Sequence, residues 1–329
     1  MAREEFNGYV DIHVHARDLE ERYKETVEHV LNVIAPSQNV SIIFDMPNTK
    51  KPLLRKEDVE RKLSVVPKGK ENSYFVWIGI TAEEDQIIEA ISLVEEHEKV
   101  IGIKMFAGKS VGSLALIKRE EREIVYEALT KNNYKGVLAV HCEMEDLIKN
   151  DLFDPERPET HCLARPPEAE IRSVEEQINL AKKHGFKGTL HICHVSLPET
   201  VELVDKARKE MKITCGVTPH HLLWDESMMK GKGKLGLIYK MNPPLREKSK
   251  VEMLRNLVSQ GKVDFLESDH APHHIGEKLF PPYLSGFPSL YLYKEMAEEF
   301  LPKIGTKKEI IEKMTKENAI KLFGEKILK

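Results

Sequence analysis

The first apolar segment of the chain places histidines at alternate positions. It reads YVDIHVH over residues 9–15. If it forms a β-strand, Asp11, His13 and His15 lie on one face, because successive side chains of a strand point to opposite sides. A lone histidine in a strand is usually a hydrogen-bonded core residue, but two on one face are harder to satisfy in that way. The two histidines alone therefore do not distinguish between a structural role and a metal site.

Later apolar segments also end in side chains that could bind a metal. Lys104 lies in VIGIKMF, His141 in GVLAVHC, His194 in TLHICHV and Asp269 in VDFLESD. If these segments are parallel strands of one barrel, their C-terminal ends meet at one face, where the active sites of such barrels lie. Four imidazoles and a carboxylate suit zinc and its neighbours among the divalent metals. The spacing therefore predicts a metal site built from several strand ends.

Lys104 is the unusual member of this set. An ammonium group within an apolar segment is costly to bury without a partner. Burial beside metal ions favours the neutral amine, which can react with carbon dioxide to give a carbamate, a bridging anionic ligand. The alternative is an ordinary ion pair with a carboxylate such as Glu143.

The elements that must position these residues repeat along the chain. Short apolar runs alternate with segments of helical period, such as residues 82–97, 173–185 and 196–211, as in a parallel sheet with crossover helices. Eight runs predict an α/β fold, a (β/α)8 TIM barrel, with a doubly wound sheet as the alternative. The runs occupy residues 9–15, 40–46, 74–80, 100–106, 136–142, 189–195, 213–218 and 263–269.

Composition indicates a single ordinary domain over residues 1–329, since no shift in composition marks a boundary. With 50 Lys and Arg against 54 Asp and Glu, the net charge of −4 offers no argument for nucleic acid or membrane partners. No apolar run approaches the ~18 residues of a membrane span, and the start lacks a signal-peptide core, so a cytoplasmic location is expected. Residues 150–168 and 225–246 are expected to be long loops.

The four cysteines form no C-x-x-C pair, which argues against a zinc ribbon or a disulfide framework. We interpret Cys142, Cys193 and Cys215 as small buried strand residues, with a thiol nucleophile as the alternative. Cys142 alternates with His141 and should face away from the predicted site, which argues against a nucleophilic role for it.

From residue 10 to about residue 290 the chain resembles the dihydroorotases of the amidohydrolase superfamily. The motifs that carry the resemblance are DIHVHARD, DMPNT, GIKMF, HCE, HICHVS, TPHHL, NPPLR and SDHAPH. The resemblance implies a barrel of the kind predicted above. It also implies the interconversion of N-carbamoyl-L-aspartate and L-dihydroorotate, in pyrimidine biosynthesis.

The resemblance also implies a binuclear site, with zinc as the expected metal. His13, His15 and Asp269 would hold one ion, His141 and His194 the second, and carboxylated Lys104 would bridge them. His191 would lie behind these ligands. Some members of the family use an aspartate as the bridge, but GIKMF is similar to the lysine-bearing kind. Asp269 would carry the proton from the attacking water to the leaving nitrogen.

Substrate contacts follow from the same motifs. Arg17 would bind the substrate carboxylate, assisted by Asn48, Asn242 and His273. The alternatives are turn stabilisation beside proline for the two asparagines and an ordinary surface role for Arg17 and His273.

Two features depart from the family pattern. Many relatives carry a small β-sandwich built from segments on both sides of the barrel, whereas here the first strand begins near residue 10, so the barrel should stand nearly alone. The segment GFPSL (286–290) differs from the expected glycine-rich version, which puts substrate contacts with its backbone in doubt. The sequence leaves open a homo-oligomer and the association with aspartate transcarbamoylase seen in some relatives.

Two other functions compete with this interpretation. A hydantoinase, dihydropyrimidinase or allantoinase would share the metal site, but a substrate without a carboxylate has no use for Arg17. A catalytically silent barrel that serves as a scaffold would need no metal, yet all six predicted ligand residues are present.

Overall fold

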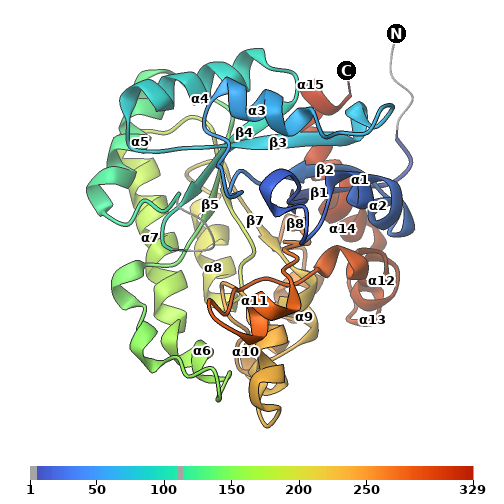
Figure 1. Cartoon of the computed structure of the whole chain (residues 1–329). Coiled ribbons are helices and arrows are strands. Elements are labelled where there is room, and N and C mark those ends of the chain that lie inside the picture. The colour runs from blue at the N-terminus through green and yellow to red at the C-terminus, as the bar shows by residue number, and fades with distance from the viewer. Residues whose placement is uncertain (1–5, 110–113, 329) are drawn as a thin grey trace.

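The computed structural model describes residues 6–109 and 114–328 and contains one eight-stranded parallel sheet in sequential order (Figure 1). Each of the eight predicted apolar runs contributes one strand, so the prediction of eight βα units is confirmed. The strands are β1 (Tyr9–Val14), β2 (Val40–Asp45), β3 (Tyr74–Gly79), β4 (Val100–Phe106), β5 (Val137–His141), β6 (Thr189–Ile192), β7 (Ile213–Val217) and β8 (Phe265–Leu266).

The sheet curls into a nearly closed barrel, because the segment after β8 returns to β1. Val14 and His270 form a parallel bridge, and the His15 amide donates to the His270 carbonyl at 2.8 Å. Asp11 adds to this closure, since its carboxylate accepts the Ser268 amide at 3.0 Å. A (β/α)8 barrel is therefore confirmed, and the doubly wound sheet is excluded. All the named strands of the described residues belong to this barrel.

Helices cover the outside of the sheet (Figure 1). The predicted helices at 82–97, 173–185 and 196–211 correspond to α4, α7 and α8, and α7 ends where Gly185 adopts the left-handed conformation that glycine tolerates best. None of the helices in the described part of the chain is long and apolar enough to cross a membrane. The α-helices are α1 (Val27–His29), α2 (Ala35–Ser37), α3 (Lys56–Leu63), α4 (Glu84–Glu96), α5 (Arg119–Lys131), α6 (Thr160–Ala164), α7 (Pro167–His184), α8 (Pro198–Ala207), α9 (Pro219–Leu223), α10 (Lys248–Ser259), α11 (Ile275–Leu279), α12 (Tyr293–Glu295), α13 (Leu301–Lys303), α14 (Lys308–Glu312) and α15 (Asn318–Ile327).

The two segments expected to be long loops contain short helical turns. Residues 150–168 include α6 and the start of α7, and residues 225–246 include two 3-10 helices, so the loop prediction was too coarse. Turns this short are fixed by local caps, such as the Asp225 side chain on the Ser227 amide, rather than by a helical repeat. The 3-10 helices are η1 (Leu19–Glu21), η3 (Glu71–Ser73), η4 (Glu145–Leu147), η5 (Asn150–Leu152), η6 (Glu226–Met229), η7 (Gly233–Tyr239) and η8 (Ser289–Leu292). The π-helices are η2 (Val30–Ile34), η9 (Met296–Phe300) and η10 (Lys313–Glu317).

An aromatic cluster fills one end of the barrel interior. Phe44 and Trp77 point inward from β2 and β3, and Phe323 of α15 packs edge-on against both, with ring centroids 5.0 and 5.7 Å away. The C-terminal helix therefore closes the end of the barrel opposite the predicted site. The sequence did not predict this role for α15.

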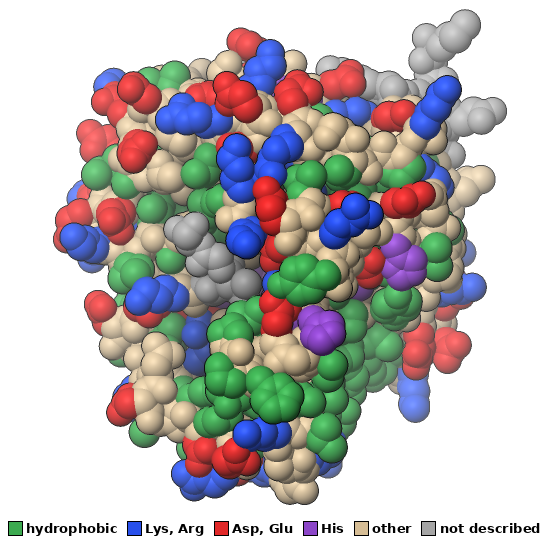
Figure 2. Space-filling model, viewed as in Figure 1, with side chains coloured by type: hydrophobic (Ala, Val, Ile, Leu, Met, Phe, Trp, Pro, Cys, Tyr) green, Lys and Arg blue, Asp and Glu red, His purple; other side chains and the backbone are tan. Residues whose placement is uncertain are grey.

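The small net charge of −4 comes from nearly equal numbers of basic and acidic side chains. Figure 2 shows this mixture on one face, with an apolar area over the region where Figure 1 places α11. Neither positive nor negative charge dominates this face, so it does not show the basic patch that is typical of nucleic acid binding.

Candidate metal centre

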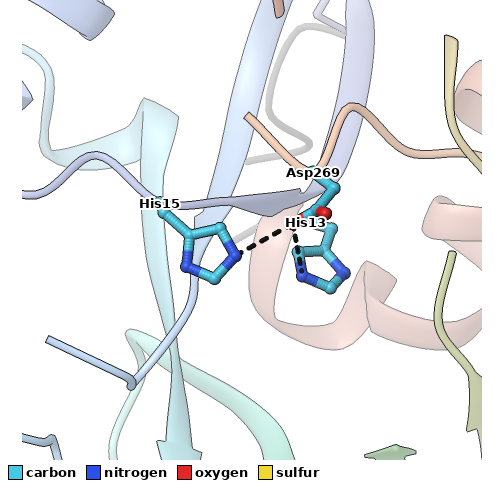
Figure 3. A group of neighbouring side chains, drawn as sticks. All are labelled: His13, His15 and Asp269. Atoms are coloured by element: carbon cyan, nitrogen blue, oxygen red, sulfur yellow. Dashed lines mark hydrogen bonds and ion pairs between the residues drawn. The ribbon is translucent and has the colours of Figure 1, made fainter. Parts of the chain in front are cut away.

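Two histidines from the end of β1 meet an aspartate that follows β8 (Figure 3). His13 Nε2 and His15 Nε2 lie 3.3 and 3.0 Å from the same oxygen, Oδ1 of Asp269. All three side chains are buried, and their ligand atoms lie close enough together to hold one metal ion. The simple alternation predicted for β1 is wrong in detail, because Val10 and Ile12 pack in the barrel interior and Val14 in the outer core. The register of β1 shifts between Asp11 and Val14, and this irregularity turns both imidazoles toward the site.

The charge states of His15 and Asp269 suit metal binding. In His13, by contrast, the effect of burial is outweighed by Asp269 and by hydrogen bonds, which raise its pKa to about 9, so a metal ion would have to displace a proton there. Burial lowers the pKa of His15 to about 4 despite the neighbouring Asp269, so the imidazole is neutral and keeps its lone pair. Burial alone would raise the pKa of Asp269, but His13 and His15 outweigh it and hold that pKa well below its usual range. Asp269 is therefore an anionic ligand at neutral pH.

A second pair of histidines lies across the barrel mouth. His141 ends β5 and His194 follows β6, and His141 Nδ1 lies 3.1 Å from His194 Nε2. Burial, then the neighbouring His141, holds the pKa of His194 well below its usual range. The other ring nitrogen of His194, Nδ1, is buried and has no hydrogen-bond partner among the described residues.

Lys104 lies on β4 between these two groups and is fully buried. Its amine contacts the Cys193 thiol at 2.9 Å and the face of Phe106 at 5.1 Å, and it forms no ion pair with a carboxylate of the described residues. The alternative partner, Glu143, is engaged instead by Arg165 and His141, at 2.9 Å from Arg165 Nε. The ordinary ion pair considered from the sequence is therefore absent at Lys104.

Beneath these residues the structure reveals a buried carboxylate that the sequence interpretation overlooked. Glu267 Oε2 lies 3.6 Å from His13 Nδ1 and 3.2 Å from His191 Nε2, and Oε1 accepts the His194 amide. Gly216 makes room for it, since a Cβ there would come within 2.4 Å of the Glu267 carboxyl carbon. Strand alternation could have found Glu267, because it lies two residues before Asp269.

Cys193 belongs to the same buried layer. Its interpretation as a small buried strand residue is correct as far as burial goes, but its thiol faces Lys104. Burial opposes ionisation of this thiol, yet Lys104 and hydrogen bonds from His13 and His191 lower its pKa to about 5. Lys104 therefore meets an acidic thiol in place of a carboxylate.

A small cavity opens between the two histidine groups. Eight of the ten predicted site residues line it, while Lys104 lies below it and His273 lies behind Arg17. The lining residues are His13, His15, Arg17, Asn48, Phe106, His141, His194, Asn242, Asp269, Ala271, Ser285 and Gly286.

Arg17 is the one guanidinium group among these lining residues, and it is buried. Its Nε donates to the Pro272 carbonyl at 3.2 Å, and its Nη2 lies 3.2 Å from His273 Nε2. The remaining nitrogen, Nη1, is buried without a hydrogen-bond partner among the described residues. An unpaired buried donor of this kind needs an acceptor, which an anionic ligand in the cavity would supply.

Asn242 and His273 are held by neighbours of their own. His161 Nε2 lies 3.1 Å from the Asn242 side-chain oxygen, and His273 Nε2 lies 3.0 Å from the Ser285 carbonyl. Ser285 and the next residue, Gly286, also line the cavity, so the GFPSL segment that departs from the family pattern does border the site.

The residues present fit a pair of metal ions. Four buried imidazoles and one carboxylate are the ligand types that zinc and related ions select. Unpartnered imidazole nitrogens beside buried groups are costly unless something binds them. The observation that supports the fit is Nδ1 of buried His194, which has no hydrogen-bond partner among the described residues. The nearby Lys104 amine contacts a thiol and pairs with no carboxylate of those residues.

Solved structures with the same fold support the architecture. The chain matches dihydropyrimidinase from Brevibacillus agri with a TM-score of 0.82 at 21% identity, over 96% of this chain and 70% of the other. It matches L-hydantoinase from Arthrobacter aurescens with a TM-score of 0.81 at 21% identity, over 96% and 71%. At this identity the likeness shows the shared barrel fold.

Sequence comparison gives more similar relatives, although no family model matches the chain. Dihydroorotase of Aeropyrum pernix is 33% identical over 86% of this chain and 61% of its own length. The dihydroorotases of Thermococcus kodakarensis and Listeria welshimeri are each 30% identical, over 96% and 94% of this chain and 68% and 71% of their own lengths. The chain thus spans about two thirds of the relatives it matches. On these similarities, the chain belongs to the dihydroorotase family.

Proposed function

We propose that this protein is a dihydroorotase that interconverts L-dihydroorotate and N-carbamoyl-L-aspartate, the pair that feeds pyrimidine biosynthesis. The observation that carries the proposal is the buried Arg17 guanidinium, at a cavity that the histidines and Asp269 also line. Its Nη1 has no hydrogen-bond partner in the part of the chain that the structure describes. A carboxylate on the substrate would supply that partner. Its ring amide could then face the metal ligands.

We propose that two divalent ions, zinc by ligand preference, bind here. His13, His15 and Asp269 would hold one, His141 and His194 the other, and Lys104 would bridge them as a carbamate. The carbamate would account for a buried amine that no carboxylate of the described residues pairs with, since carboxylation would make Lys104 itself an anion. When bound, the ions would acidify a water molecule and polarise the ring amide carbonyl.

The chain's own residues would then bind the substrate and move the proton. Arg17 would bind the substrate carboxylate. Asn48 and Asn242 line the cavity, where their side-chain amides would assist in binding. In ring opening, Asp269 would take the proton of the attacking water and give it to the ring nitrogen as the bond between carbonyl carbon and nitrogen breaks. In ring closure Asp269 would remove a proton from the carbamoyl nitrogen as this nitrogen bonds to the carboxyl carbon, and would return the proton to the oxygen that leaves as water.

His273 would act behind Arg17. Its Nε2 lies 3.2 Å from Arg17 Nη2 and, in the tautomer in which that nitrogen accepts, would keep the arginine aligned with the substrate. The substrate would therefore be recognised by a guanidinium that its neighbours hold in place, rather than by a flexible surface side chain.

The proposal is tested by turnover of the purified, zinc-loaded protein on L-dihydroorotate and N-carbamoyl-L-aspartate, with hydantoin, dihydrouracil and allantoin alongside. Turnover of only the first pair is expected. Turnover of the uncharged rings instead would make the protein a different cyclic amidase. If the protein binds two ions but turns over none of these substrates, a role as a scaffold for a partner enzyme would be favoured.

Arg17→Met provides the matched variant for the carboxylate assignment. The methionine keeps an apolar stem but removes the charge-assisted hydrogen bonds, so KM for L-dihydroorotate should rise about a hundredfold. The metal content should stay unchanged because Arg17 is not a proposed ligand. Unchanged turnover of L-dihydroorotate would refute the assignment of Arg17 to the carboxylate.

A further inference from the structure

The backbone that carries Arg17 has an unusual conformation. Arg17, Asp18 and Leu19 have φ angles of 54°, 69° and 51°, so three consecutive residues other than glycine lie in the left-handed region. Side chains with a Cβ disfavour this region because of steric clashes. Such a run persists only where the surroundings fix it, and strain of this kind is typical of functional sites.

One set of contacts that fixes this segment is local. The Asp18 carboxylate accepts the Leu19 amide at 2.7 Å and the Val27 amide at 2.9 Å, which ties the turn to the start of α1. These contacts stabilise the turn itself. They do not connect it to the barrel that holds the metal ligands.

The connection to the barrel is a buried ion pair. Lys62 of α3 lies 3.0 Å from Asp45 at the end of β2, and both side chains are almost completely inaccessible. The Lys62 amine also donates to the Arg17 carbonyl, and Asp45 Oδ1 accepts the Ala16 amide at 2.9 Å. Both members of the pair thus bond to the peptide groups on either side of the Ala16–Arg17 link.

A third residue completes the network. The hydroxyl of Tyr74, at the start of β3, donates to Asp45 Oδ2 at 2.5 Å. Tyr74 is buried, and its hydroxyl holds the carboxylate oxygen that faces Lys62. Two adjacent strands and α3 therefore fix the backbone from which the Arg17 side chain reaches the cavity.

We propose that Asp45 and Lys62 are positioning residues that set the left-handed backbone at Arg17 and thereby aim its guanidinium at the substrate carboxylate. The inference rests on the proposed function of Arg17. Buried ion pairs are a poor source of stability, because their desolvation offsets most of their attraction. This pair hydrogen-bonds to the peptide groups of Ala16 and Arg17, and two apolar side chains in its place could not fix the backbone in this way.

Lys62→Met tests the proposal, since it keeps the apolar stem and removes the donor to the Arg17 carbonyl. KM for L-dihydroorotate should rise on the order of tenfold, the scale of one misaligned hydrogen bond to a charged group, while kcat and metal content hold. The same change in an Arg17→Met background should add nothing to KM, because Lys62 acts through Arg17. An equal rise in both backgrounds would overturn the proposal.

If Lys62→Met fails to fold, Tyr74→Phe provides a second test of the same proposal. It removes one buried hydroxyl from the network and should raise KM in the same direction but by less. Tyr126→Phe is the matched control, because the Tyr126 hydroxyl is also buried and donates to a side chain, Gln177, on α7. Equal KM changes in the two variants would contradict a specific role.

Hydrogen exchange separates failure of this inference from failure of the proposed function. Amide exchange in the peptide covering residues 16–22 should accelerate in Lys62→Met and Tyr74→Phe relative to Tyr126→Phe. This readout does not require turnover, so it holds even if L-dihydroorotate is not the substrate. Unchanged exchange in this peptide would show that the pair does not fix the backbone.

Discussion

The two halves of the candidate metal centre differ in where their negative charge comes from. The half at β1 and β8 carries its own carboxylate, since His13 and His15 both face Asp269. The half at β5 and β6 has two imidazoles in contact with each other, and the nearby carboxylate, Glu143, is paired with Arg165. Lys104 lies between the halves as an amine.

This difference indicates how each half would bind a metal ion. The first half is complete as folded, because an anionic oxygen and two imidazoles already converge. The second half presents two imidazoles beside an amine and would need an added anion to balance a divalent ion. A carbamate on Lys104 would supply it, so the second half should depend on carbon dioxide and the first should not.

The largest effect is expected from Asp269→Asn, which removes the anionic ligand and the proposed proton carrier together. Turnover of L-dihydroorotate should fall about a thousandfold or more, the usual scale for losing a general acid and base. Steady-state kinetics with metal analysis of the same sample checks it. If the variant kept most of its rate, the proton carrier would have to be sought elsewhere.

Lys104→Ala tests the second half. Activity should fall by roughly a hundredfold, as when a charge-stabilising group is removed from an active site, and the ion at His141 and His194 should be largely lost. Short carboxylic acids should restore part of the rate by standing in for the carbamate. Labelled bicarbonate should modify the wild-type protein but not the variant. Full activity in Lys104→Ala would end the carbamate hypothesis.

A matched pair of variants compares the carboxylates behind each half. Glu267 Oε2 lies against His13 and Glu143 against His141. A glutamine at position 267 keeps an oxygen that can accept the His194 amide, so Glu267→Gln and Glu143→Gln each weaken one orienting contact to an imidazole. Metal affinity should drop roughly 10- to 100-fold at the half concerned, the usual cost of losing a partner that orients a ligand. Competition with a chelator measures this. Losses spread equally over both ions in each variant would mean that the halves are not independent.

The smallest effect is expected at Cys142, next to His141 in sequence but on the opposite face of the strand. Its thiol is buried in the outer apolar core, and burial holds its pKa well above the usual range. Cys142→Ala should leave kinetics and metal content unchanged and cost about 1 kcal/mol of stability through lost packing. Thermal unfolding and kinetics check both parts. A large loss of rate would instead support the hypothesis that the Cys142 thiol is a nucleophile.

Much of this architecture follows from local sequence patterns. Eight apolar runs separated by polar segments predict eight strands, and strand alternation places His13 with His15 and turns Cys142 away. The types of residue at the strand ends predict a divalent metal site. Their roles as ligands remain predictions, although the structure gathers eight of the ten predicted site residues around one cavity.

Tertiary structure alone decided the contacts between distant segments. The left-handed turn at Arg17 depends on Asp45 and Lys62, which lie on other elements, and α15 closes the barrel through Phe323. Glu267 takes its place because Gly216 on the neighbouring strand leaves room. Local periodicity reports which face of an element is buried, whereas the partner on that face is set by how the whole chain packs.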